Sequence, residues 1–111
     1  MVQYLAQRTA FAALSDTTRR GILEQLGHRA ASVTELAGHF GMTLTGIKKH
    51  IQLLEDAGLV VSEKAGRVRI CRLGPNHLEV ETTWIENYRR TLEERYDHLE
   101  AFLERTKGDE Q

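Results

Sequence analysis

The stretch "GMTLTGIKKHIQLLEDAGLV", residues 41–60, combines a helical pattern with a cluster of basic side chains. Ile47, Ile51 and Leu54 recur at the spacing of one helix face, which predicts a helix with a single apolar side. The opposite side of this helix carries positions 45, 48, 49 and 52. Its middle holds three adjacent nitrogen-bearing side chains, Lys48, Lys49 and His50.

A second, shorter helix is predicted just before this one. Ser32 and Glu35 have the S-x-x-E spacing of a capping box, in which side chain and backbone satisfy each other at a helix start. We expect this helix to end near Gly41. Thr43 is the next N-cap candidate, for a helix that continues to about Ala57. Residues 32–57 therefore predict a helix, a tight turn and a helix.

Two more helices are expected upstream. Residues 4–14, "YLAQRTAFAAL", have a helical apolar pattern, and Asp16 is positioned to cap a following helix over residues 17–26. Gly27 is the expected stop of that second helix.

A β-hairpin is predicted immediately downstream. In "LVVSEKAGRVRICRL", residues 59–73, two β-branched runs flank a glycine-containing loop. Lys64 precedes the turn, and Arg67 and Arg69 lie on the returning strand. The hairpin, taken as residues 60–73, therefore carries positive charge.

A long helix over residues 78–105 follows the only proline, Pro75, and would be ~40 Å long at 1.5 Å per residue. Its apolar stripe contains more large side chains than one small core needs. Either the helix wraps around its own domain, or it pairs with a second copy together with the first helix. The interface residues expected in the second case are Leu5, Trp84, Ile85, Tyr88, Leu92, Tyr96, Leu99, Phe102 and Leu103.

Composition limits the possible classes of protein. A chain of 111 residues with 41% hydrophobic and 28% charged residues fits one globular domain. Its net charge of -1 hides a division: residues 1–78 carry +4 and residues 79–111 carry -5. There is no apolar run of membrane-spanning length and no secretory signal pattern, and the single cysteine, Cys71, fits a reducing compartment. We expect a cytoplasmic protein that makes no contact with membranes.

The predicted order of elements is that of a winged helix-turn-helix: mainly α, with a small β-hairpin and a long C-terminal helix for dimerisation. The expected division is a DNA-binding core at 4–76, a dimerisation helix at 78–105 and a disordered tail at 106–111. In this fold the second helix enters the major groove of DNA, and the hairpin contacts the flanking backbone or minor groove. The expected DNA contacts are Thr43, Leu44, Thr45, Lys48, Lys49, His50, Lys64, Arg67 and Arg69. Two alternatives stay open: a merely solvated basic face, and a module that docks an acidic protein.

Three segments resemble the ArsR-type winged-helix regulators of bacteria: "FAALSDTTRRGILEQL", "SVTELAGHFGMTLTGIKKHIQLLEDAGLV" and "EKAGRVRICRL". The resemblance covers residues 10–73. It implies a homodimeric transcriptional repressor bound to double-stranded DNA, with contacts at Thr43, Thr45, Lys48, Lys49 and His50. A two-fold dimer would require a near-palindromic operator with half-sites ~34–36 Å apart.

The metal sites of that family are not matched. Ser32, Val33 and Thr34 stand where metal-sensing relatives have Cys-x-Cys. On the C-terminal helix, aligning His98 with a family ligand leaves Ile85, Asn87 and Ala101 in place of the other three. We therefore expect no metal and no cofactor, and the sequence assigns no small-molecule inducer.

Two other functions have weaker support in the sequence. Asp97, His98 and Glu100 are adjacent, but no nucleophile with a matched base accompanies them, so no catalytic residue is assigned. Cys71 is expected to be a small residue packed in a strand. The alternative is a redox-gated or ligand-gated sensor, which would need a thiol pKa lowered by the neighbouring arginines.

Overall fold

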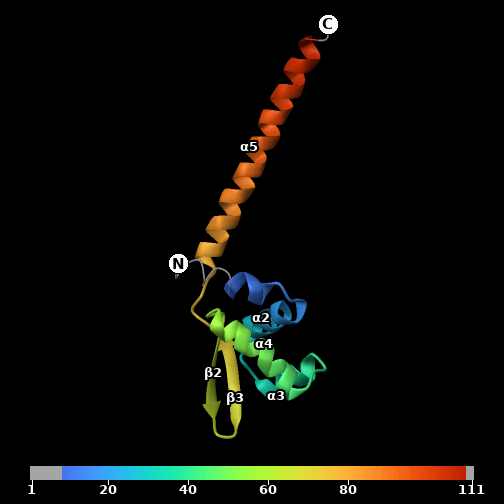
Figure 1. Cartoon of the computed structure of the whole chain (residues 1–111). Coiled ribbons are helices and arrows are strands. Elements are labelled where there is room, and N and C mark those ends of the chain that lie inside the picture. Colours follow the sequence, from blue (N-terminus) through green and yellow to red (C-terminus); the bar gives the residue numbers. More distant parts are fainter. Residues whose placement is uncertain (1–8, 110–111) are drawn as a thin grey trace. The chain divides into compact units, whose positions relative to one another are not determined.

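The computed structural model describes residues 9–109 (Figure 1), and the side chains of residues 9–106. A helical segment over residues 9–14 comes first. The elements that follow are α2 (Thr17–His28), β1 (Ala31–Ser32), α3 (Val33–His39), α4 (Leu44–Asp56), β2 (Val60–Ala65), β3 (Val68–Leu73) and α5 (Glu79–Asp109). The chain forms two compact units that divide after Leu78. The first unit is the predicted mainly α fold with a small sheet, and the second is the long helix.

Polar side chains start three of the helices, as the sequence predicts. Asp16, Ser32 and Thr43 are the N-caps of α2, α3 and α4. In each case the side-chain oxygen accepts a hydrogen bond from the amide three residues further on, at 3.1, 3.0 and 3.1 Å. The capping box is complete, because the Ser32 amide also donates to Glu35 Oε1 at 3.4 Å. These caps satisfy amides that a helix start would otherwise leave unpaired.

The turn between α3 and α4 depends on Gly41. Its φ of 61° lies in the left-handed region, where a side chain would be strained. The Met42 amide donates back to the Ala37 carbonyl at 2.9 Å, which closes the end of α3. This closure lets α4 begin within a few residues and fixes the direction in which it leaves the turn.

The sheet has the order β1-β3-β2, with both pairs antiparallel. The register places Ala31 opposite Cys71 and Ala65 opposite Val68, so the hairpin loop is residues 66–67. We refer to the β2–β3 hairpin as the wing. β1 was not expected, because two residues are too short to show an alternating pattern.

The core lies between the helices and the sheet. The predicted inward stripe of α4 is buried as expected, with Ile47, Ile51 and Leu54 each at most 3% exposed. The other members of the buried apolar cluster are Ala10, Ala13, Ile22, Leu26, Ala31, Val33, Leu36, Ala37, Ala57, Leu59, Val60 and Cys71.

Some predicted boundaries differ from the structure. The prediction that Gly27 ends α2 is wrong: the helix continues to His28, and the Arg29 amide still donates to the Gln25 carbonyl. A glycine weakens a helix by about 1 kcal/mol but does not block its geometry. α5 continues past residue 105 to Asp109. Residues 4–8 of the predicted first helix, and with them Leu5, lie outside the described residues, as do residues 110–111.

The exit from the wing is held against the end of α4. The Gly74 amide donates to the Leu59 carbonyl at 2.8 Å, and the Asn76 amide donates to the Gly58 carbonyl at 3.0 Å. Asn76 Nδ2 also donates to the Ala57 carbonyl at 2.7 Å. A Cβ on Gly74 would lie 2.4 Å from the Gly58 oxygen, so the two backbones approach too closely for any other residue.

We therefore expect Gly74→Ala to destabilise the first unit by about 2 kcal/mol, since the backbone of Gly58 must shift to admit the methyl group. Urea unfolding followed by circular dichroism would measure the change. Gly38→Ala is the control, because a Cβ there meets nothing within 4 Å and alanine within α3 should not lower stability. If Gly74→Ala unfolds at the midpoint of the unchanged protein, the close approach does not contribute to stability.

Candidate nucleic-acid interface

The outward face of α4 is the predicted one. Thr45, Lys48 and Lys49 are exposed on the side of the helix opposite its buried stripe, and Leu44 beside them is 47% exposed. Thr43 is also exposed, but its hydroxyl oxygen accepts the capping hydrogen bond described above. That hydroxyl can still donate, so the start of α4 combines a free donor with the positive end of the helix dipole.

A groove of about 370 Å³ runs between α4 and the wing. Lys48 contributes to it from the helix, and Lys64, Arg67 and Arg69 contribute from the wing. Half of its lining residues are basic and none is acidic, so the groove concentrates positive potential where a polyanion could enter. The remaining lining residues are Val33, Thr34, Leu44 and Val68.

Strand alternation explains why the wing presents these side chains to the helix. Ser62 pairs with Cys71 and Lys64 pairs with Arg69, so these four residues share one face of the hairpin. Cys71 on that face is buried in the core. The same face therefore points toward the helices, and Lys64 and Arg69 extend it beyond the edge of the core. Arg72 lies on the other face, where it pairs with Glu63.

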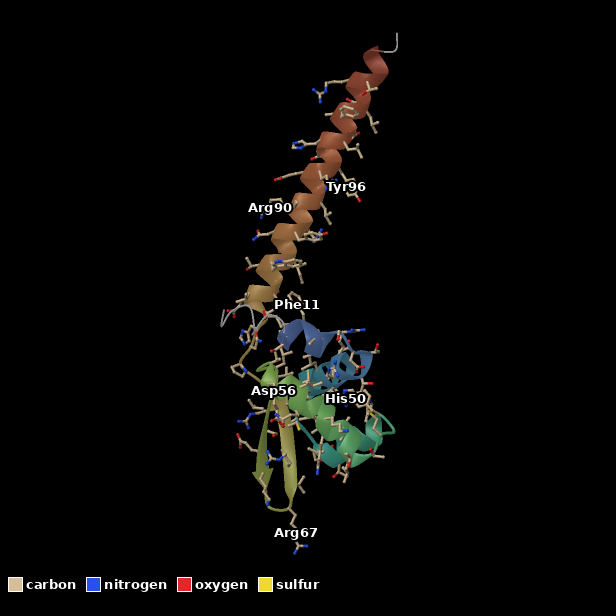
Figure 2. All side chains as sticks on the ribbon, viewed as in Figure 1. Phe11, His50, Asp56, Arg67, Arg90 and Tyr96 are labelled. Carbon is tan, nitrogen blue, oxygen red and sulfur yellow. The ribbon has the colours of Figure 1, made fainter. Side chains whose placement is uncertain are left out.

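A chain of hydrogen bonds ties the wing to α4. Arg69 Nη1 donates to Ser62 Oγ at 2.9 Å, and Ser62 Oγ donates to Glu55 Oε1 at 2.9 Å. Lys48, Gln52, Glu55 and Arg69 line a second hollow at this junction. Arg69 is thus held in a fixed place in the groove, in contrast to Arg67, which points away from the tip of the hairpin (Figure 2).

His50 lies on the flank of α4 away from the groove. It is two residues from Lys48, which is about 200° around the helix. Its Nδ1 lies 3.1 Å from Arg19 Nη1 and 3.8 Å from Asp16 Oδ2, at the start of α2. Asp16 has a pKa below its usual value, mainly because the Arg19 amide donates to it and secondarily because of the nearby charge of Arg19. The carboxylate therefore stays ionised at neutral pH.

The groove brings together five of the nine predicted DNA contacts: Leu44, Lys48, Lys64, Arg67 and Arg69. Thr43, Thr45 and Lys49 lie on α4 outside its lining, and His50 lies on the opposite flank. Reasoning from the sequence missed two candidate contacts: Thr34, which lines the groove, and Gln52, which lines the second hollow beside it. The signal for Gln52 was present, because it is one helical turn after Lys48.

Cys71 is 0% exposed. Burial raises the pKa of its thiol, the charge of Glu55 raises it further, and Arg69 only partly opposes them. This direction is opposite to the one a thiolate switch needs. Because the pKa is raised in the folded state, the protonated thiol makes its full contribution to folding stability below the unfolded pKa of ~8.5. This contribution to stability is lost as the pH rises through the pKa of the folded state.

We therefore expect the thiol of the native protein to react with a disulfide reagent at pH 8 about 100-fold more slowly than that of the protein in denaturant. Absorbance of the released thiolate would follow both reactions. Labelling of the native protein at the denatured rate would mean that the thiol is accessible, and would revive the redox-gated alternative.

α5 carries a continuous exposed apolar face. Trp84 and Tyr88 stack on it, with ring centroids 5.3 Å apart and planes 10° apart. The eight large apolar residues predicted for this face are each between 37% and 68% exposed: Trp84, Ile85, Tyr88, Leu92, Tyr96, Leu99, Phe102 and Leu103. Leu5, the ninth predicted interface residue, lies outside the described residues.

Within residues 9–109, no three His, Cys, Asp or Glu side chains come together in a way that could hold a metal ion. No helix in the same part of the chain is both long enough and apolar enough to cross a membrane.

The arrangement of α3, the Gly41 turn, α4 and the hairpin defines a winged helix-turn-helix protein. Comparisons with known proteins agree. A family model described as a helix-turn-helix domain matches residues 14–63. The HTH-type transcriptional regulator Rv2034 of Mycobacterium tuberculosis is 33% identical over 88 residues, which span 79% of this chain and 82% of that protein. The transcriptional repressor SdpR of Bacillus subtilis is 28% identical over 78 residues, or 70% of this chain and 87% of that protein.

A solved structure agrees over nearly the whole chain. The ArsR-like transcriptional regulator from Rhodococcus sp. RHA1 is 31% identical and has a TM-score of 0.77, covering 92% of this chain and 94% of that one. The chain belongs to the ArsR family of winged helix-turn-helix transcriptional regulators.

Proposed function

We propose that this protein is a homodimeric, sequence-specific repressor, acting in the cytoplasm, that binds a near-palindromic operator in double-stranded DNA. The observation that carries the proposal is the basic groove between α4 and the wing, since its charges come from two elements and converge on one hollow. α4 enters the major groove and presents Thr43, Leu44, Thr45, Lys48 and Lys49, with His50 on its flank. Lys64, Arg67 and Arg69 meet the adjacent backbone or minor groove.

The apolar face of α5 supports the dimer. A face of eight large side chains along one helix is strongly unfavourable in water, and burying it against the same face of a second copy removes that cost. A two-fold pair would present two copies of α4 to half-sites about one turn of DNA apart.

Repression follows from binding at an operator that overlaps a promoter, where the bound dimer excludes the polymerase. SdpR, a relative named as a transcriptional repressor, supports this direction of regulation. Binding to the protein's own upstream region would make the repressor autoregulatory.

Selection of bound duplexes from a random-sequence library tests the proposal directly. We expect enrichment of an inverted repeat whose half-sites are ~34–36 Å apart. Fluorescence anisotropy with the selected duplex should give an affinity that falls steeply as salt rises, because bound phosphates release counterions. No enrichment over the starting library, with retention of an acidic protein instead, would replace the repressor with the protein-docking alternative.

A further inference from the structure

Arg19 connects three elements of the first unit. Its Nε donates to the Ala13 carbonyl at 2.8 Å and its Nη2 donates to the Ala12 carbonyl at 2.9 Å, which caps the end of the helical segment over residues 9–14. Its Nη1 reaches His50 Nδ1 on α4 at 3.1 Å. Arg19 itself belongs to α2. Its side chain therefore links α2 to the preceding helical segment through two hydrogen bonds and to α4 through a third.

This contact determines which ring nitrogen of His50 carries the proton. A guanidinium has only donors, so Nδ1 must be the acceptor and the ring proton must sit on Nε2. Among the described residues, no hydrogen bond from Nε2 is present. Its side chain is 21% exposed, so the ring keeps one donor that solvent or a ligand can reach.

The flank of α4 that carries His50 is where the second DNA strand would pass. A helix in the major groove lies between two phosphate backbones, and the helix before it crosses one of them. The basic groove with Lys48 serves one side of α4. His50, about 200° around the helix from Lys48, serves the other side.

We propose, building on the proposed DNA-binding function, that Arg19 is a positioning residue for operator binding. It fixes the tautomer and orientation of His50 so that the Nε2–H donates to a backbone phosphate. Arg19 itself meets no DNA. Its contribution reaches the duplex only through the imidazole ring.

Arg20 provides a matched control, because it is adjacent in the sequence and also caps the same helical segment. Its Nη1 donates to the Leu14 carbonyl at 2.7 Å, and none of its hydrogen bonds involves His50. Arg19→Lys and Arg20→Lys both keep the positive charge and both remove a guanidinium cap. They differ in the contact with His50.

The test measures binding of a fluorescent duplex, selected by the unchanged protein from a random library, at a temperature where circular dichroism shows all variants folded. We expect Arg19→Lys to weaken binding about tenfold, the loss typical of a hydrogen bond to a charged group, and Arg20→Lys to change it less than twofold. His50→Ala should also weaken binding about tenfold. In the His50→Ala background, Arg19→Lys should have no further effect, because the two residues act as one unit.

Three results overturn the inference alone. The first is equal affinity for Arg19→Lys and Arg20→Lys, and the second is additive losses for Arg19→Lys and His50→Ala. The third is a His50→Ala variant that binds as tightly as the unchanged protein. If the unchanged protein selects no duplex, the proposed function fails and the inference fails with it, so the two failures are distinguishable.

Discussion

Lys48→Glu is expected to lower the affinity for the selected operator about 100-fold, which corresponds to about 2.7 kcal/mol. Lys48 is the one residue of α4 that lines both hollows beside the wing, together with Arg69. The substitution removes the proposed phosphate contact and places a carboxylate among three cations and next to the incoming polyanion. In a dimer, both subunits bound to one operator carry the substitution. Fluorescence anisotropy at several salt concentrations would measure both the affinity and its salt dependence.

The slope of log K against log salt should also become shallower by about 1 for each subunit that contacts the duplex. Arg29→Glu is the matched control: Arg29 is exposed after the end of α2, outside the groove lining, and the substitution changes the charge equally. If both variants lose the same affinity, the effect is one of total charge and the groove has no special role. If neither loses affinity, the assigned surface is wrong.

Leu99→Glu is expected to convert the proposed dimer to a monomer, with the dissociation constant rising at least ~100-fold. Leu99 is central in the exposed face of α5 and 52% exposed in the single chain. An unpaired carboxylate buried at an apolar interface is strongly unfavourable, and two-fold symmetry would bring two of them into one contact surface. Sedimentation equilibrium would report the halved mass, and affinity for the full operator should fall as the two half-sites stop acting together.

Ala101→Glu is the control for this variant. It lies two residues away on the same helix, about 200° around from Leu99, and is itself exposed. The same carboxylate on the opposite side should leave the mass unchanged. A dimer that survives Leu99→Glu would place the contact between copies elsewhere and leave the apolar face of α5 unexplained.

The parts of the fold governed by local chemistry were predictable from the sequence. Asp16, Ser32 and Thr43 were recognisable as N-caps because each is a short polar side chain directly before a helical apolar pattern. Such a side chain can accept a hydrogen bond from a free amide at the helix start. The outward orientation of Lys48 and Lys49 followed from the period of the buried stripe beneath them. The end of α2 was misplaced because the glycine there is tolerated inside the helix.

The relations between elements could not be predicted in the same way. The groove forms because the register of the wing places Lys64 and Arg69 on the side that faces the helices. That register is set by how the two strands pair, which residue composition does not reveal. His50 looked like one more member of a basic face. The helical period alone separates it from Lys48, but only the packing of α2 against α4 brings it to Arg19.

The two-residue loop of the hairpin has a consequence for how related proteins could diversify. Because side chains and hydrogen-bonded pairs both repeat every second residue, inserting two residues on each side of residues 66–67 would lengthen the hairpin, keep the same loop geometry and leave Ser62 and Cys71 on their faces. In the proposed complex, the span of duplex covered by each subunit would therefore change independently of the helices that recognise its sequence. Footprint length and base preference would then be separate, independently evolvable properties of this scaffold.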